Sequence, residues 1–415
     1  MIWRWLFSKT IRDACALRKH VQRLLNAQRD LMTPAANQLV QGALLESQVA
    51  INDRLKNPDL RKQMEKLEQV AGKWLRPYPH AAWRENVEVL LVALAVAMGI
   101  RTFFLQPFKI PTGSMQPTLY GITSTNLIAD KNFQIPTGLE RVKEWFEGIS
   151  YVHVVAQADG AIDYITPMRR FLIFNIKQTI SVGGMAQTIW FPPDLGESVS
   201  DREGNTIDPL IYRAGLIPGH VYHKGEDVVK LEVNAGDHLF VDRLTFNFRK
   251  PQRGEIIVFE TEGIPGGMRD RYRIPPDQFY IKRLVALPNE RVSIGNDRHL
   301  VIDGRRLDAS TPHFESVYGF NPSKPPRESE YSGHVNGTVS QKYELSLGVP
   351  PLFPDEKTVY EVPPNYCMPM GDNTCNSSDS RFWGAIPEDY VIGKSFFVYW
   401  PITKRFGVGQ SVTAR

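Results

Sequence analysis

The sequence predicts a mainly β domain that follows one transmembrane helix and an N-terminal α-helical region. Three observations support this fold class. The stretch Val89–Ile100 is apolar and contains no charged residue. The residues before it show the loose apolar periodicity of helices. Beyond residue 120, short runs rich in Val, Ile, Phe and Tyr are separated by Gly, Pro and Asp turns, as in β-strands.

The overall composition is that of a globular protein with two or three domains. The chain has 415 residues, of which 23% are charged and 42% hydrophobic, so a substantial core is available. The net charge is only +4, and no basic stripe is interleaved with aromatic residues. This pattern argues against nucleic acid as a partner.

The N-terminal residues 1–86 are expected to form a cytoplasmic helical module. Helices are predicted at Ile11–Met32, after Pro34, and at Asp59–Trp74, with Asp59 as the N-cap of the third. The sequence does not indicate what this module does.

Residues 87–105 are expected to be the transmembrane helix. With its flanks, the apolar stretch has about the length that crosses a bilayer as a helix. A buried core helix is the alternative, but Trp83 before it and Phe103-Phe104 after it suit the aromatic belts of a membrane protein. Residues 1–86 contain 15 basic and 8 acidic residues, which orients them to the cytoplasm and the rest of the chain outside.

The exported part is expected to be a β core with two insertions. A β-hairpin is predicted to turn at Asp303-Gly304, between two apolar runs. The predicted segments are the core at 106–120, 236–295 and 361–401, a first insertion at 121–235, a second insertion at 296–360, and a C-terminal tail at 402–415.

The cysteines leave one question open. Cys15 falls on the cytoplasmic side, whereas Cys367 and Cys375 fall on the exported side, where a disulfide is permitted. A bridge between these two and a pair of free thiols both remain possible.

Ser114 is the candidate nucleophile. It lies between Pro111-Thr112-Gly113 and Met115, in a rigid turn a few residues after the apolar stretch. A serine nucleophile needs a base, but none of the nine histidines lies in a catalytic context. His220 and His223 have a spacing that a metal site can use, yet no third ligand is evident, so ordinary turn histidines are the better interpretation.

Lys282 is the candidate base, because burial can bring the pKa of a lysine toward neutrality. On an alternating strand it shares a face with Tyr280 and Leu284, which supply an apolar wall that excludes water from the amine. Taken alone, this segment is more typical of an ordinary exposed strand lysine.

A third polar segment, residues 370–381, has the Gly, Asn, Asp and Ser content of a tight loop. Ser377 is positioned to hold the lysine amine by a hydrogen bond, and Asp379 with Arg381 to form a bracing ion pair. A plain turn is the alternative.

Together these segments resemble the conserved boxes of the bacterial type I signal peptidases, or leader peptidases, which are membrane-bound Ser/Lys proteases. Residues 396–401 also resemble the closing strand of that family. The resemblance implies a signal-peptidase-like β fold. Asn289, Ala286 and Thr374 depart from the family pattern, and the first insertion is unusually long. The four matching boxes, in the order of the family, are 111–119, 236–243, 280–288 and 371–381.

The resemblance also implies the roles of individual residues. Ser114 is the nucleophile and Lys282 the general base, while the Ser114 amide and the Thr112 hydroxyl form an oxyanion hole. Ser377 positions the lysine, and Asp379 and Arg381 brace the loop. No metal or organic cofactor is required. The residues that the resemblance places around the substrate are Ile110, Met115, Leu119, Tyr280 and Ile281.

The resemblance implies a single-pass serine endopeptidase of the bacterial inner membrane. Its substrates are exported preproteins, whose signal peptides are cleaved after small, Ala-x-Ala-like residues. Its other partners are the lipid bilayer, which an apolar surface around Ile110 and Met115 is expected to touch, and transiently the secretion translocon. Two alternatives are a Ser/Lys protease that matures one secretion component and an inactive, membrane-tethered peptide-binding module.

Overall fold

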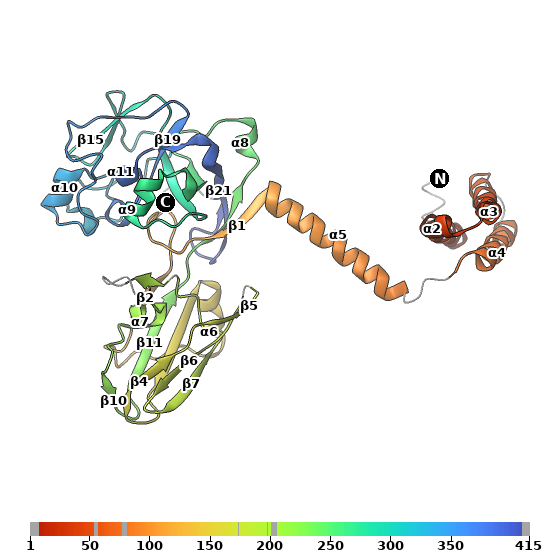
Figure 1. Ribbon diagram of the computed structural model, residues 1–415, viewed down its shortest axis with the longest axis horizontal. Coiled ribbons are helices and arrows are strands. Elements are labelled where there is room, and N and C mark those ends of the chain that lie inside the picture. Colours follow the sequence, from red (N-terminus) through yellow and green to blue (C-terminus); the bar gives the residue numbers. More distant parts are fainter. Residues whose placement is uncertain are drawn as a thin grey trace. The chain divides into compact units, whose positions relative to one another are not determined.

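The structure is a computed structural model, which describes residues 8–53, 57–76, 81–172, 174–196, 198–200 and 206–408. The chain divides into two compact units, Met1–Ala97 and Met98–Arg415, which are described separately. Figure 1 shows the helices of the N-terminal unit and the mainly β remainder.

Before the apolar stretch, the described residues of the N-terminal unit form three α-helices, as the sequence predicts. They share a small apolar core in which Val21, Leu25, Val40 and Leu67 are buried. The predicted N-cap at Asp59 is wrong, because the third helix begins two residues earlier and Asp59 lies in its first turn. The helices are α2 (Lys9–Gln28), continued by a 3₁₀ turn over Arg29–Leu31, α3 (Pro34–Asn52) and α4 (Asn57–Trp74).

The apolar stretch forms one continuous helix, α5 (Ala81–Phe103). It begins before the predicted residue 87, because Trp83-Arg84-Glu85-Asn86 contains no helix breaker and continues the same helix. Among the described residues, only this helix, over Trp83–Phe103, is long and apolar enough to cross a membrane.

The core of the second unit is an antiparallel sheet that follows α5 directly. Strand β1 lies at one end of the sheet and pairs with β12, while the interior strand β14 is paired on both sides, with β13 and β19. The order along the sheet is β1 (Leu105–Lys109), β12 (His238–Asp242), β21 (Val391–Trp400), β13 (Ile256–Glu260), β14 (Phe279–Ala286), β19 (Tyr366–Met370) and β20 (Ile386–Pro387), with β22 (Gly407–Val408) beside β21.

The first insertion is mainly β (Figure 1), and its described residues form two larger sheets and one two-stranded sheet. It has a hydrophobic core of its own. Buried Ile180 and Val182 pack there with Leu210 and Leu231. Its helices α6 (Gly138–Phe146) and α7 (Pro209–Ala214) were not predicted from the sequence. One sheet holds β2 (Thr123–Asn126), β11 (Asp227–Asn234) and β3 (Ile149–Val155); the other holds β10 (Val221–Tyr222), β4 (Gly160–Ile165), β6 (Phe174–Val182), β5 (Arg169–Phe171) and β7 (Met185–Trp190), and β8 (Val199–Ser200) pairs with β9 (Thr206–Ile207) separately.

A four-stranded sheet joins the second insertion to the core segments on either side of it. The predicted hairpin at Asp303-Gly304 is confirmed, since both residues have the positive φ angles, 48° and 79°, that a tight two-residue turn needs. A short helix, α10 (Gly337–Lys342), was not predicted. The strands are β17 (Arg305–Arg306), β16 (Leu300–Ile302), β15 (Arg291–Ile294) and β18 (Tyr360–Glu361).

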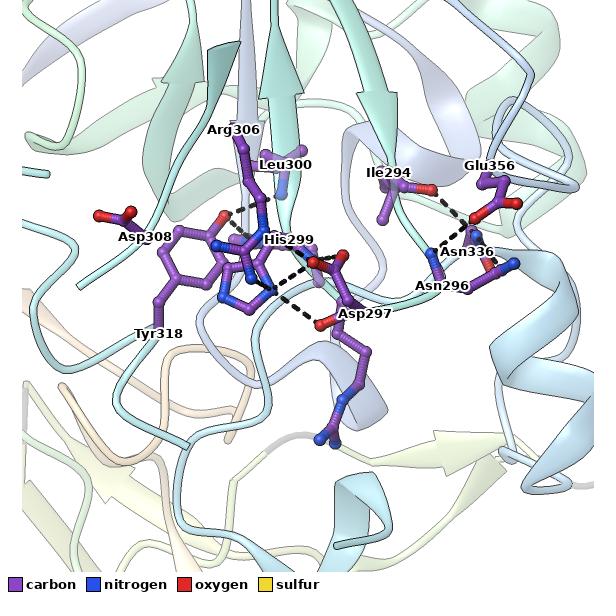
Figure 2. Close-up of polar contacts among 12 residues, drawn as sticks. Ile294, Asn296, Asp297, His299, Leu300, Arg306, Asp308, Tyr318, Asn336 and Glu356 are labelled. Carbon is purple, nitrogen blue, oxygen red and sulfur yellow. Dashed lines mark hydrogen bonds and ion pairs between the residues drawn. The ribbon is translucent and has the colours of Figure 1, made fainter. Parts of the chain in front are cut away.

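A network of polar side chains fixes this sheet to the loops around it (Figure 2). Arg306 lies between Asp297 and His299, donating to the carboxylate of Asp297 at 2.7 Å. The His299 ring is stacked on Tyr318, whose hydroxyl also contacts the buried His334 at 3.1 Å. Burial lowers the pKa of His334 to about 4, so this histidine is neutral at physiological pH.

Candidate active site

The turn that carries Ser114 is held by backbone hydrogen bonds from two distant segments. The Ile110 amide donates to the Asp237 carbonyl at 2.9 Å, and the Asn373 amide donates to the Ser114 carbonyl at 3.0 Å. Both approaches require glycine. A Cβ on Gly236 would clash with the Ile110 carbonyl, and a Cβ on Gly371 would lie 2.5 Å from the Ser114 carbonyl oxygen. These glycines of the second and fourth boxes therefore allow the close approach that fixes the serine.

Lys282 reaches the serine from the centre of the core sheet. Its Nζ lies 2.7 Å from Ser114 Oγ and 3.0 Å from the Ile281 carbonyl oxygen. Both side chains are buried, with Lys282 4% and Ser114 6% exposed. The structure therefore brings together the two residues that the sequence predicts as nucleophile and base, although they are 168 residues apart.

The surroundings of Lys282 favour the neutral amine. Burial lowers its pKa from the ordinary value of 10.5 to about 8, against the opposing influence of the Asp379 and Asp372 carboxylates. The aromatic ring of Tyr280 lies 5.3 Å from Nζ, on the strand face where the sequence places an apolar wall. An amine with this pKa is partly deprotonated near neutral pH, which a general base requires.

The predicted ion pair between Asp379 and Arg381 is present and fully buried. The Arg381 guanidinium makes two hydrogen bonds to the carboxylate, at 2.9 and 3.0 Å. Burial alone would raise the pKa of Asp379, but the Arg381 charge and the Gly371 amide hold it below its usual value. Arg381 Nη1 also donates to Thr374 Oγ1 at 2.7 Å. Thr374, a departure from the family pattern, is therefore part of the bracing network.

A second buried ion pair was missed from the sequence. Arg283 makes two hydrogen bonds to Asp372, at 2.8 and 2.6 Å, and Thr118 Oγ1 donates to the same carboxylate at 2.5 Å. The pair connects the lysine strand, the loop after β19 and the nucleophile turn. The available signal was that Arg283 directly follows Lys282 and that Asp372 directly precedes Asn373 in their boxes.

Three of the predicted substrate-contacting residues are in the protein interior. Ile110, Met115 and Leu119 are 2%, 0% and 3% exposed and pack in one hydrophobic cluster of the core sheet. The prediction of an apolar, lipid-facing surface around Ile110 and Met115 is therefore wrong. Their side chains fill the space beneath the nucleophile turn, a role that the sequence could not separate from contact with substrate. Tyr280 and Ile281 are partly exposed and remain available to a ligand.

One expected side-chain contact is not formed, and one open question is answered. Ser377 is fully buried, but its Oγ makes no hydrogen bond to Lys282. Its hydroxyl instead helps to lower the pKa of the Asp379 carboxyl. Cys367 and Cys375 are free thiols, which settles the choice left open by their spacing. Thr112, the expected second oxyanion donor, is exposed at the surface of the nucleophile turn.

A polar cavity of about 340 Å³ lies beside the nucleophile turn. Gln116 and Pro117 line one wall, and Thr374 and Cys375 line another. The remaining wall comes from the second insertion, including Arg327 and Glu330. The second insertion thus shapes the surface next to Ser114.

A buried serine hydroxyl in contact with a desolvated lysine amine, on a mainly β scaffold, is the arrangement expected of serine hydrolases that use lysine in place of histidine. Comparisons with known proteins agree with this class. A sequence model described as "Signal peptidase, peptidase S26" matches residues 83–138 and 220–400, more than half of the chain. The chain belongs to this family of serine endopeptidases.

Several signal peptidases are also similar to part of the chain. Signal peptidase I of Pseudomonas fluorescens is 28% identical over 47% of this chain and 69% of its own length. Signal peptidase I of Leptolyngbya laminosa is 27% identical over 42% of this chain and 64% of its own length. A crystal structure of a signal peptidase I from Enterococcus faecalis aligns with 26% identity over 35% of this chain and 97% of its own, at a TM-score of 0.22 that supports no argument about the fold.

Proposed function

We propose that this protein is a membrane-anchored endopeptidase that removes signal peptides from exported preproteins with a Ser114–Lys282 dyad. The 2.7 Å contact between Lys282 Nζ and Ser114 Oγ carries the proposal, together with the burial of both groups. Membership of the signal peptidase family supports preproteins with signal peptides as the substrates. Cleavage after Ala-x-Ala-like residues and transient contact with the secretion translocon are carried over from the same family.

In the proposed reaction, Ser114 Oγ attacks the scissile carbonyl carbon while its proton passes to the neutral Lys282 Nζ. The Ser114 amide and the Thr112 hydroxyl donate to the developing oxyanion. When the intermediate collapses, the C–N bond breaks and the lysine ammonium returns the proton to the departing amine. The mature protein leaves, and the signal peptide stays as an ester on Ser114.

Deacylation repeats the same proton transfers with water. Lys282 accepts a proton as the water oxygen attacks the ester carbonyl, and the C–O bond to Ser114 then breaks. Lysine returns the proton to Ser114 Oγ, which regenerates the dyad. In this proposal the buried pairs Arg283–Asp372 and Asp379–Arg381 hold the backbone around the dyad and do not exchange protons.

The position of β1 supports binding of an extended peptide. This strand ends the sheet and pairs with β12 only on one side, so its other edge is available for strand addition. Phe108 on β1 packs edge-on against Phe279 of β14, with ring centroids 5.1 Å apart, which places both strands next to one potential peptide path. Orientation of α5 across the membrane, with residues 1–86 in the cytoplasm, is part of the same proposal.

The function is tested with the purified full chain and a preprotein substrate. Ser114→Ala and Lys282→Met are expected to lower kcat by at least about 10³-fold. Ser181→Ala and Lys230→Met make the same substitutions at buried residues of the first insertion and serve as controls that retain activity. N-terminal sequencing of the product identifies the cleaved bond.

Retention of processing by Ser114→Ala would refute the dyad. Cleavage of a panel of preproteins distinguishes a general signal peptidase from a protease that matures one secretion component. The general enzyme cleaves many preproteins of the panel, and the narrow one cleaves a single preprotein. No cleavage of any member, combined with peptide binding, would instead favour the inactive module.

A further inference from the structure

The tip of the β5–β6 hairpin in the first insertion exposes large apolar side chains. Phe171 and Phe174 lie opposite each other in the register of these strands, and Leu172 lies between them in the chain. The three side chains are 67%, 62% and 82% exposed. Neighbouring apolar residues are rarely this open on a surface that faces only water.

The adjacent strand extends this surface. Trp190 of β7 lies opposite Lys177 of β6, and the Phe191 amide donates to the Ile176 carbonyl at 2.9 Å. Trp190 and Phe191 are also mostly exposed. We call Phe171, Leu172, Phe174, Trp190 and Phe191 the hairpin tip. All five lie at the end of the sheet away from the Gly183-Gly184 turn that joins β6 to β7.

Basic residues surround the hairpin tip. Arg169 and Arg170 are exposed on β5, and Lys177 Nζ lies 5.8 Å from the centre of the Trp190 ring. Residues 164–193 contain no Asp or Glu. The next acid along the chain, Asp194, is paired with Lys109. The surface therefore combines exposed aromatic rings with net positive charge.

The Lys109–Asp194 pair also ties the hairpin tip to the strand that follows α5. The two charged groups are 2.5 Å apart, and Asp194 follows Phe191 by three residues. Lys109 is the last residue of β1, which begins at Leu105, two residues after the end of α5. Five strand residues span only about 17 Å, so the sheet is fastened close to the end of the apolar helix.

We propose that the hairpin tip docks on the surface of a lipid bilayer with anionic headgroups. The aromatic and leucine side chains enter the headgroup region, while the two arginines and Lys177 contact lipid phosphates, the division of roles found in interfacial anchors. The hairpin tip lies within residues 139–219, which the family match does not cover. It adds a second membrane contact to the one expected of α5.

The test places one probe on the hairpin tip and a matched probe at the other end of the same sheet. Leu172→Cys and Met185→Cys are made in the full chain, each with Cys15→Ser and Cys375→Ser, and labelled with a nitroxide. Both positions are exposed, and Met185 follows the Gly183-Gly184 turn. The chain is reconstituted in phosphatidylcholine vesicles with or without phosphatidylglycerol.

In vesicles with phosphatidylglycerol, the label at residue 172 is expected to be several-fold less accessible to a water-soluble relaxation agent than the label at 185. Arg169→Glu with Arg170→Glu should restore access at 172 without changing access at 185. Equal access at both positions would overturn the proposal. Protection of residue 172 in native membranes but not in pure lipid would also overturn it, because the occupant would then be a protein. Neither result depends on peptidase activity.

Discussion

The two insertions of this chain relate to the β core in different ways. The first insertion has its own hydrophobic core, whose buried members all lie within residues 122–233. The second insertion shares its core with the main sheet: Leu300 and Phe314 pack in one cluster with Val285 of β14 and Met370 of β19. The first is thus a lobe with separate packing, whereas the second extends the interior of the peptidase core.

Polar contacts follow the same division. In the second insertion, Tyr331 contacts Thr118 of the nucleophile turn at 3.0 Å, and the Val335 amide donates to Thr374 at 3.0 Å. Contacts of the first insertion with the core include the Lys109–Asp194 pair and the bond from the Ile402 amide to the Phe146 carbonyl. At its first residues, the Ile122 amide also donates to the Pro111 carbonyl at 3.2 Å, at the start of the nucleophile turn.

This difference indicates which added segment the chemistry depends on. The second insertion supports the loops that hold Ser114 and Lys282, so we infer that catalysis requires it. From its separate core, we infer that changes within residues 139–219 of the first insertion leave those loops in place. The family match, which spans the second insertion but omits residues 139–219, agrees with this distinction.

The largest expected difference is between two buried leucines. Leu300→Ala in the second insertion and Leu210→Ala in the first each remove a fully buried side chain, at an expected cost of about 3–5 kcal/mol in unfolding free energy. Only Leu300→Ala should lower cleavage of a soluble peptide substantially, because its cavity lies in the shared core. Hydrogen exchange locates the destabilised segment, and peptide assays at a permissive temperature measure activity.

Leu210→Ala provides the counter-test in the same experiment. Exchange should increase within residues 121–235, with kcat/KM near that of the parent protein. Equal loss of activity in both variants would show that the first insertion is also coupled to the dyad.

A smaller effect is expected at Thr374, which joins the second insertion to Arg381. Thr374→Val keeps the side-chain shape but removes the acceptor used by Arg381 Nη1 and the Val335 amide. We expect a loss of about 1–3 kcal/mol in stability and a several-fold lower kcat, since two buried donors lose a partner. Thr188→Val, at an exposed pair in the first insertion, should change stability by less than about 0.5 kcal/mol. An unchanged kcat in Thr374→Val would contradict the inference that the second insertion supports the loops around Ser114 and Lys282.

The smallest effect is expected at the ion pair of the first insertion. Asp194→Asn should cost only about 0–1 kcal/mol, because both side chains are partly exposed. Partial burial raises the pKa of Asp194, but Lys109 outweighs it and holds the pKa below its usual value. The contribution of the pair is therefore present at neutral pH and is lost as the pH falls through that lowered pKa. Chemical unfolding of the parent protein and of Asp194→Asn, at neutral and at acid pH, measures this contribution. A larger difference in unfolding free energy at acid pH than at neutral pH would contradict a stabilising Lys109–Asp194 pair.

The sequence predicted that Ser114 and Lys282, the proposed catalytic pair, lie together, because both residues lie in short, ordered motifs. The residues on either side of Ser114 and of Lys282 fix the local backbone. The contact between the two side chains then follows from the fold of the core sheet. The strands around them were also predictable, since β13, β15 and β21 are runs of β-branched and aromatic residues.

Contacts that depend on burial were not predictable. Met115 and Ile110 are apolar whether they face a substrate or the interior, and only the packing shows that they face the interior. The Arg283–Asp372 pair joins residues 89 apart through the closing of the sheet, which no local pattern encodes. Helices α6 and α10 lie in insertions where turn residues obscure a short helical period.

The pH dependence of kcat/KM on a soluble peptide tests the central claim most directly. If a desolvated Lys282 removes the Ser114 proton, the protonated amine is inactive, so activity must rise with pH through a pKa of about 8. A rise centred near the ordinary lysine value of 10.5, or a profile set by a histidine near 6.5, would contradict the assignment of Lys282 as a neutral base.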